Sequence, residues 1–346
     1  MKRIILFAAM LIVIVLIVPT VMVALVKDGE DLTESAFGLA PIEKKQEAGQ
    51  TEVRSEQVAA KDTNGPDIAV YRSNAEAVEQ MALEDYVMGV VASEMPADYE
   101  VEALKAQALA ARTFAVAQMK NGDKNGDVPQ GALVTDTVAH QVYQSKDELK
   151  EKWKDAFDSN WEKVETAVRD TSGEIMTYDG EPITASFFST SNGFTENAED
   201  YWEQEVPYLK SVPSPWDKQS PRFANETVIP ISEFEATLGI TLQNDGSIGT
   251  IEARTAGGRV ETVTFENKTL SGREVREALE LDSSDFSWHV SNGQVVIQTK
   301  GWGHGVGMSQ YGANGMAQEG KTYKDIVQYF YKDVEIESMD ELVPTS

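Results

Sequence analysis

The longest apolar run lies at the start of the chain. Residues 4–26 include no charged side chain, Lys2 and Arg3 precede them, and Lys27 follows. The run exceeds the about 20 residues that a helix needs to cross a bilayer, and no clear cleavage site of small residues follows it. Because basic residues precede the run and acidic ones follow it, we expect the amino terminus inside. We therefore predict a cytoplasmic tip and transmembrane anchor over residues 1–27, rather than a cleaved signal peptide, with the rest of the chain outside the cytoplasm.

Helical spacing of apolar residues recurs further along the chain, in residues 81–92, 102–120 and 153–168. The second of these segments is rich in alanine, and Asp98 before it is a suitable N-cap. The sequence from Thr322 to Asp325 forms a capping box, which opens a last helix that we expect to end at Tyr331. Residues 28–66, by contrast, are polar with few aromatics, which is typical of a flexible tether.

Strand signals begin in the middle of the chain. Residues 175–178 and 183–188 are joined by Asp179 and Gly180, a pair that suits the positive φ angles of a tight hairpin turn. The polar, glycine-containing segment 189–202 that follows is a suitable loop for contacting a ligand.

The pattern of apolar and polar residues changes between residues 223 and 298. Strands are expected there at 262–265 and 295–299, and a short helix at 272–281. We interpret this segment as a smaller α+β module inserted into a mixed helix and sheet domain that spans residues 67–337, with a tail at 338–346. The predicted fold class is therefore α+β.

Glycines alternate with large residues in the segment Gly301-Trp-Gly-His-Gly-Val-Gly-Met308. In an extended strand this period places every glycine on one face. Because each glycine weakens a strand, we expect another backbone or a flat ligand to lie against the bare face. A tightly packed structural turn is the alternative. The polar residues Ser309, Gln310 and Tyr311 would then lie at the exit of the strand.

Composition narrows the possible partners. The chain has 57 acidic and 30 basic residues, a net charge of −27, which argues against nucleic acid and against flat docking on an anionic lipid surface. There is no cysteine, so disulfides and thiolate metal sites are excluded. The three histidines, His140, His289 and His304, are isolated from one another, and no metal or other cofactor is expected.

Glu94 is the best candidate for acid–base chemistry. It follows a predicted helix and has apolar neighbours in sequence, and such surroundings raise the pKa of a carboxyl group. A surface glutamate at a helix end is the alternative. Lys105 and Arg112 lie about two turns apart on the next helix, so they share one face. Both could be solvated surface charges, although a buried guanidinium among these alanines would need carboxylate or carbonyl partners. A nucleophile–base pair of Ser189 or Ser191 with His304 is not favoured, because no Gly-x-Ser-x-Gly elbow or orienting acid is present.

Several specific segments together carry a resemblance to a known family. They are Glu94-Met-Pro, residues 102–113, Ser189-Thr-Ser-Asn-Gly-Phe-Thr-Glu196, Pro207-Tyr-Leu209 and residues 301–313. In these segments the chain resembles the stage II sporulation protein D family, and the resemblance extends from the amino-terminal run to about Val334. Some members of that family hold zinc near the segment equivalent to residues 135–141. Only His140 remains there, which argues against zinc in this chain.

The resemblance implies a membrane-anchored lytic transglycosylase that cleaves peptidoglycan glycan strands lacking stem peptides during forespore engulfment. The implied location is the septal and engulfing membrane of the mother cell, and the implied partners are stage II sporulation proteins P and M. Glu94 matches the family's catalytic acid. Our candidates for binding sugar or orienting Glu94 are Lys105, Arg112, Ser189, Tyr208, His304, Gln310 and Tyr311.

Two other functions stay open on the sequence. A related amidase-enhancer group shares this domain, so the chain could instead be a non-catalytic glycan-binding activator of a cell-wall amidase. A simple muramidase, which would release reducing ends, is the third hypothesis. The presence of Glu94 favours an enzyme.

Overall fold

The computed structural model describes residues 65–122, 128, 129, 131–242 and 247–341. Within these ranges no helix is long and apolar enough to cross a membrane. The expected membrane span at residues 4–26 and nearly all of the expected tether lie outside the described residues, so both stay predictions. The fold class is α+β, with helices and several small sheets.

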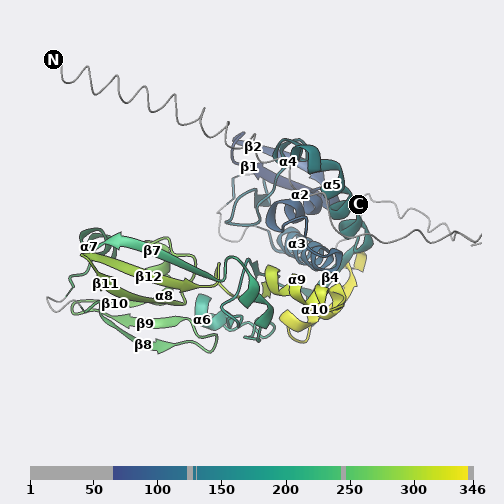
Figure 1. The fold of residues 1–346 in the computed structure, drawn as a ribbon. Coiled ribbons are helices and arrows are strands. Elements are labelled where there is room, and N and C mark those ends of the chain that lie inside the picture. The colour runs from purple at the N-terminus through teal and green to yellow at the C-terminus, as the bar shows by residue number, and fades with distance from the viewer. Residues whose placement is uncertain (1–64, 123–127, 130, 243–246, 342–346) are drawn as a thin grey trace, which may run out of the picture. The chain divides into compact units, whose positions relative to one another are not determined.

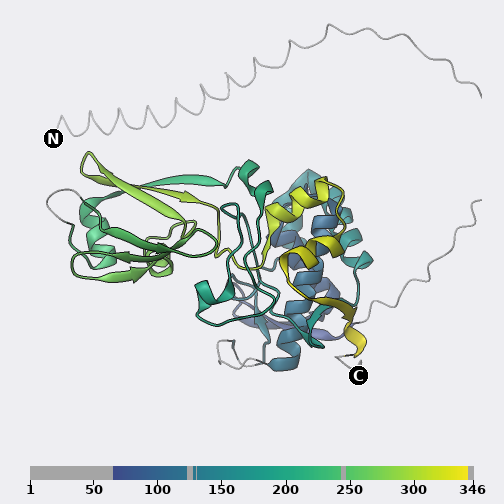
Figure 2. The ribbon, with the colours of Figure 1, turned by 90° about the horizontal axis from the view of Figure 1, so that it is seen from below.

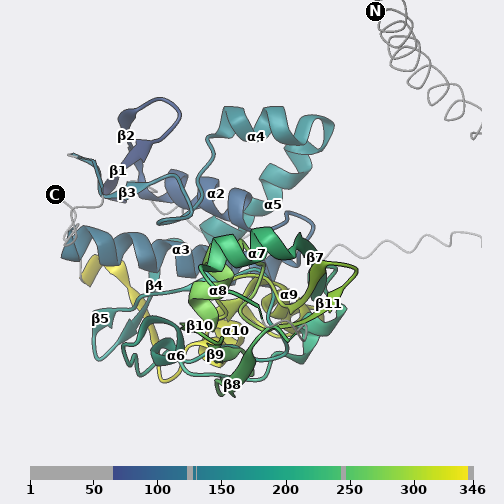
Figure 3. The ribbon, with the colours of Figure 1, turned by 90° about the vertical axis from the view of Figure 1, so that its left-hand side faces the viewer.

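Helix α3 (Val101–Asn121) is the centre of the larger hydrophobic core. Figures 1 and 3 show it between α2 (Leu83–Glu94) on one side and the pair α9 (Gln310–Gln318) and α10 (Tyr323–Phe330) on the other. Its buried alanines allow the neighbouring helices to approach closely; they are Ala103, Ala106, Ala108, Ala110, Ala111, Ala115 and Ala117. Helix α5 (Phe157–Asp170) packs against both α2 and α3.

Three small sheets border these helices. In the first, β1 (Asp67–Arg72) pairs antiparallel with β2 (Ala77–Ala82) and parallel with β3 (Val134–Thr135). In the second, β4 (Glu174–Tyr178) lies between β5 (Glu181–Pro182) and β14 (Glu335–Ser338). The third is the parallel pair of β6 (Phe187–Phe188) and β13 (Met308–Ser309). This last pair matters most for the site, because it brings residues 184–190 beside the start of α9.

Several local predictions are confirmed and others are wrong. The capping box at Thr322 and Asp325 is present, and Asp179 and Gly180 both have positive φ in the turn after β4. The N-cap of α3 is Glu100 rather than Asp98, and no side chain caps it. The expected helix at residues 153–168 is divided, since α4 (Lys146–Trp153) and a 3-10 turn at Lys154–Ala156 precede α5. The predicted second hairpin strand at residues 183–188 is wrong, because β5 at residues 181–182 pairs with β4 and residues 187–188 pair with β13 instead.

Residues 224–300 carry a second hydrophobic cluster, separate from the one around α3. One sheet has the order β11-β12-β7, formed by Phe286–Ser291, Gln294–Lys300 and Ala224–Pro230. The other has the order β10-β9-β8, formed by Thr269–Ser271, Val260–Thr264 and Thr250–Arg254. Helices α7 (Ile231–Leu238) and α8 (Gly272–Ala278) complete this part of the fold, drawn in green in Figures 1 and 2. Short helices α6 (Ala198–Trp202), η2 (Pro215–Gln219) and η3 (Met339–Glu341) lie outside it.

The glycine-rich segment is not a strand. Gly301, Gly303, Gly305 and Gly307 all have positive φ, between 80° and 110°, so the period of two encodes alternating backbone conformations that only glycine adopts readily. A side chain at Gly301 would approach the carbonyl oxygen of Thr190, and one at Gly305 would meet the guanidinium of Arg259. Protein atoms thus occupy the space beside these glycines. At Gly301 and Gly307 these are backbone atoms of residues 190–192 and of Ser186, which confirms the expected close approach of another backbone and not the flat ligand. The alternative of a tightly packed turn describes this segment better.

Candidate active site

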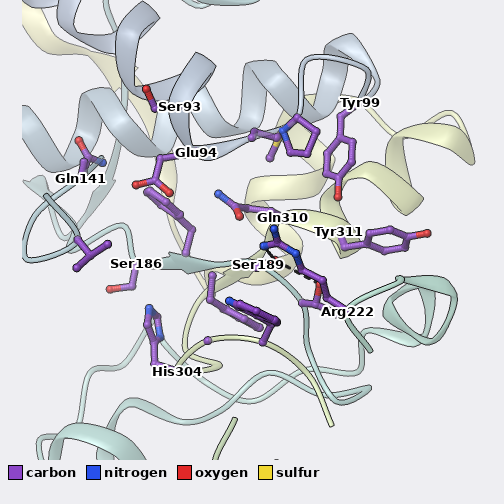
Figure 4. A pocket seen from close by; sticks show the side chains of 18 of the residues that line it. Ser93, Glu94, Tyr99, Gln141, Ser186, Ser189, Arg222, His304, Gln310 and Tyr311 are labelled. Carbon is purple, nitrogen blue, oxygen red and sulfur yellow. Dashed lines mark hydrogen bonds between the residues drawn. The ribbon is translucent and has the colours of Figure 1, made fainter. Parts of the chain in front are cut away.

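A cavity of about 1500 Å³ lies between the end of α2, the segment 184–190 and the loop that carries His304. The start of α9 and two arginines of α8 complete its wall. The chain thus brings together segments far apart in sequence, because β6 and β13 pair beside α9. Figure 4 shows side chains from these elements converging on one space.

Glu94 is the last residue of α2 and points into this cavity (Figure 4). Its Oε1 accepts a hydrogen bond of 2.7 Å from the backbone amide of Val142. Burial raises the pKa of Glu94, and the bond from Val142, which favours the ionised form, only partly opposes this. A partly buried carboxyl group with a raised pKa can hold a proton closer to neutral pH than an exposed one.

Gln310 and Tyr311, at the start of α9, lie to one side of Glu94 in Figure 4. Gln310 is 6% exposed, and its Nε2 donates to Oε1 of Gln107 on α3 at 3.3 Å. The ring of Tyr311 meets that of Tyr99 edge to face, with 6.1 Å between centroids. Burial raises the pKa of Tyr99 to about 12, so its hydroxyl remains protonated and can donate a hydrogen bond.

His304 faces the cavity from the side opposite Glu94 (Figure 4). Its Nδ1 accepts from the amide of Val306 at 3.1 Å, which places the proton of a neutral imidazole on Nε2. Burial, with the positive charges of Arg276 and Arg259, lowers the pKa of His304 to about 4. Its ring packs among Phe188, Tyr201 and Trp202 at centroid distances of 5.5–5.7 Å. A neutral imidazole so engaged has no free lone pair for activating Ser189, so the serine nucleophile stays disfavoured.

Comparison with known proteins assigns this arrangement to a family. A family model described as "Stage II sporulation protein" matches residues 71–178. Stage II sporulation protein D of Bacillus subtilis (strain 168) is 45% identical over 98% of this chain and 97% of its own length. The chain belongs to the stage II sporulation protein D family. The Bacillus amyloliquefaciens protein of the same name is 50% identical over 79% of each chain. A protein named "Amidase enhancer" from B. subtilis is 27% identical over 70% of this chain and 39% of its own length.

The structure brings five of the eight predicted site residues of this family member together. Glu94, Ser189, His304, Gln310 and Tyr311 all line the cavity. Lys105, Arg112 and Tyr208 do not lie among its lining residues. Lys105 instead pairs with Glu102 at 3.0 Å and with Asp170 at 2.9 Å.

The placement of Arg112 corrects the sequence prediction most clearly. Its side chain is fully buried, and Nε and Nη2 donate to the two carboxylate oxygens of Glu84 at 2.8 and 2.7 Å. Further donors reach the carbonyl groups of Val168 and Glu174, both at 3.2 Å. Tyr208 is half-buried, its hydroxyl accepts from the amide of Thr184 and its ring packs on Tyr178. Both side chains already have protein partners where a sugar was expected.

Asp217 is a residue of the site that sequence reasoning missed. It is fully buried beside the cavity, and its carboxylate accepts from the amide of Ser191 at 2.8 Å, from Ser309 Oγ at 2.6 Å and from Ser214 Oγ. Burial raises its pKa, and these hydrogen bonds oppose that change. Through these hydrogen bonds the carboxylate of Asp217 connects the loop 189–192 to the start of α9. Its neighbours Trp216 and Lys218 carry no pattern that marks Asp217 as buried.

The described residues include no group of three or more histidine, aspartate and glutamate side chains that could hold a metal ion. His140, which lies in the segment where relatives were expected to bind zinc, is within 3.0 Å of Thr135 Oγ1 through its Nδ1.

Proposed function

We propose that this chain is a lytic transglycosylase that cleaves the glycan strands of peptidoglycan, with a preference for strands that lack stem peptides, during forespore engulfment. The observation that supports this most is Glu94. Among the described residues that line the cavity, the only other carboxyl group belongs to Asp98, which is exposed. Ordinary glycosidases use two carboxyl groups, so a cavity with one partly buried carboxyl group suits a reaction that needs only one.

The proposed reaction uses Glu94 twice. First, protonated Glu94 donates its proton to the glycosidic oxygen as the bond from C1 of muramic acid to that oxygen breaks. The C6 hydroxyl of the same sugar then forms a bond to C1, and its proton passes to the Glu94 carboxylate. The product ends in 1,6-anhydromuramic acid, no water is consumed, and Glu94 regains its proton.

Neighbouring groups supply binding rather than proton transfer in this proposal. The amide of Gln310 is a hydrogen-bond donor beside Glu94, and the neutral imidazole of His304, which is hydrogen-bonded to the backbone of Phe187, faces Glu94 across the cavity (Figure 4). Oriented dipoles of this kind stabilise charge as it develops in a transition state. The aromatic rings of Tyr99 and Tyr311 offer apolar faces on which sugar rings can pack.

A variant that removes only the proton tests the proposal. Glu94→Gln keeps the shape of the side chain, and loss of general acid–base assistance should reduce cleavage of strands without stem peptides by about 10²–10⁴-fold. Asp98→Asn, which removes the other carboxyl group at the cavity, is expected to keep its activity. Mass spectrometry of wild-type products should find 1,6-anhydromuramic ends. Reducing muramic ends in excess would support a muramidase instead.

The second candidate function is a non-catalytic glycan-binding activator of a cell-wall amidase. The likeness to the protein named "Amidase enhancer" favours it. If the wild type and Glu94→Gln both bind strands without stem peptides and neither cuts them, this alternative replaces the enzyme.

We also propose that residues 4–26 anchor the chain in the mother-cell membrane, that the domain lies outside the cytoplasm, and that stage II sporulation proteins P and M are its partners. The uncharged run and its flanking charges support the anchor and its orientation, and membership of the stage II sporulation protein D family supports the partners. Protease added outside mother-cell protoplasts should remove most of the chain and leave a small membrane-bound fragment. Protection of the whole chain would reverse the proposed orientation.

A further inference from the structure

The cavity has a charge opposite to that of the chain. The whole chain carries a net charge of −27, yet the described lining residues include four cationic side chains, Lys152, Arg222, Arg273 and Arg276, against the carboxyl groups of Glu94 and Asp98. Basic residues gathered at one cavity of an acidic protein favour an anionic ligand there. A glycan carries negative charge only where a sugar bears an acidic substituent.

Three of these four cations already have partners or limited access. Lys152 donates to Gln144 at 2.9 Å, and Arg273 donates from Nε to Glu277 at 2.7 Å. Arg276 donates to the hydroxyl of Tyr201 at 3.0 Å, and its Nε is enclosed by the protein. A ligand could not reach that Nε without rearrangement.

Arg222 differs from the other three. It is exposed, and the structure gives its side chain one long hydrogen bond, from Nη1 to Ser189 Oγ at 3.4 Å. No described acidic residue forms an ion pair with it. Lys152 and Arg276 also lack an ion pair, but each makes a closer hydrogen bond, to Gln144 and to Tyr201. A guanidinium has five N–H donors in a planar fork that matches a carboxylate. Most of that fork is therefore available to a ligand in the cavity.

The ring of Trp302 holds this fork in place. The guanidinium carbon of Arg222 lies 4.8 Å from the centroid of the ring, and Trp302 is itself fixed by a pair of backbone bonds with Thr190, of 2.7 and 3.1 Å. Trp302 is 39% exposed. An indole that can pack on a sugar and a guanidinium that can bind a carboxylate are thus presented together at one end of the cavity.

We propose that Arg222, seated on Trp302, binds the lactyl carboxylate of a muramic acid residue and so selects glycan strands without stem peptides. A stem peptide converts this carboxylate to an amide, which removes the charge and adds bulk. Selection would then arise from direct recognition of the exposed carboxylate. This inference rests on the proposed peptidoglycan substrate, and its test is therefore a binding ratio that does not depend on cleavage.

The experiment measures Kd by calorimetry, with the full-length chain carrying Glu94→Gln so that no strand is cut. The two probes are peptide-free glycan strands and the same strands with the lactyl carboxyl groups converted to methylamides. A charged, forked hydrogen bond predicts about ten- to hundredfold tighter binding of the free carboxylate. Adding Arg222→Gln should bring the ratio close to one, and Arg222→Lys should restore only part of it, because lysine is a point charge without the fork.

The matched control is Arg169→Gln. Arg169 lies on α5 outside the cavity, is largely exposed and pairs with Glu165, so its loss should leave the ratio unchanged. A ratio near one before Arg222 is changed, a ratio that survives Arg222→Gln, or no binding of either strand would each overturn the inference. If the ratio is found but the wild-type chain releases no product from peptide-free strands, the inference is supported and the lytic reaction is refuted. If the wild-type chain cuts strands but the binding ratio is near one, the lytic reaction is supported and the inference is refuted.

Discussion

The buried pair of Arg112 and Glu84 leads to a prediction that separates a structural role from a binding role. The perturbation is Arg112→Met, which keeps an unbranched side chain of similar length and removes the guanidinium. In the native fold this group joins four elements, since Arg112 on α3 contacts Glu84 on α2, the carbonyl of Val168 on α5 and the carbonyl of Glu174 on β4. The variant leaves the carboxylate of Glu84, which is 7% exposed, without its cation.

The expected cost follows from what remains in the interior. Removing one partner of a buried ion pair destabilises a protein by about 3–5 kcal/mol, because the other charge stays buried and uncompensated. Glu84 keeps two weak contacts, from Ser172 Oγ at 3.4 Å and the amide of Gly173 at 3.3 Å, and it lies in the first turn of α2, where an anion is favoured. These features place the cost at the lower end, about 3 kcal/mol, which lowers Tm by roughly 10 °C.

Two measurements test this prediction together. Thermal unfolding followed by circular dichroism gives the Tm of each variant, and calorimetry well below that Tm gives Kd for peptide-free strands. We expect Arg112→Met to lower Tm and leave Kd unchanged. The double variant Glu84→Gln with Arg112→Met should recover most of the lost stability, because no buried charge is left unpaired.

The opposite pattern would refute the structural role. If Arg112→Met weakens binding of the strand at unchanged Tm, Arg112 contacts the ligand as the sequence prediction held. If the double variant is no more stable than Arg112→Met alone, the cost does not come from the unpaired carboxylate of Glu84.

Three further predictions address the glycine segment, Glu94 and metal. Gly305→Ala should lower the free energy of unfolding by more than Gly320→Ala, as measured in urea, because both residues have positive φ but only Gly305 faces the Arg259 guanidinium. Burial raises the pKa of Glu94 above its ordinary value of 4.5, so the folded state holds this proton more tightly than the unfolded state. The stability of the wild type should therefore fall relative to that of Glu94→Gln as pH rises from 4.5 through the raised pKa. Urea unfolding of both proteins at pH 4 and pH 7 checks this. Prolonged chelation should leave Tm unchanged, since the chain has no cysteine and the described residues hold no cluster for a metal; a chelation-dependent loss of fold would contradict this.

Local patterns predicted the local structure well. Helices α2 and α3 follow from apolar spacing, and the capping box at Thr322 and the turn at Asp179 and Gly180 depend only on neighbouring residues. The boundary at Asp98 failed because the chain makes another turn first, with the amide of Tyr99 donating to the carbonyl of Pro96. A good N-cap residue cannot act where the backbone has not yet become helical.

The glycine segment shows how one pattern can have two physical meanings. A period of two is expected for a strand, but it is equally produced when every second residue must have positive φ. Only the neighbours decide between these readings, and the neighbours of Gly301 and Gly305 are Thr190 and Arg259, which are distant in sequence. The roles of Arg112, Asp217 and Arg222 were unpredictable for the same reason, since each depends on partners that the fold brings together.

The charges of the cavity impose a requirement on the proposed reaction. Cleavage at C1 develops positive charge on the sugar, which nearby guanidinium groups would disfavour. The carboxylate that forms as Glu94 gives up its proton is negative and lies on the other side of Gln310 from Arg222 in Figure 4. One group can therefore protonate the leaving oxygen and then stabilise the cation that remains, provided that the arginines bind carboxylates away from C1. A substrate with its lactyl carboxylate on Arg222 meets that condition for Arg222, because its guanidinium charge is then neutralised before the glycosidic bond breaks.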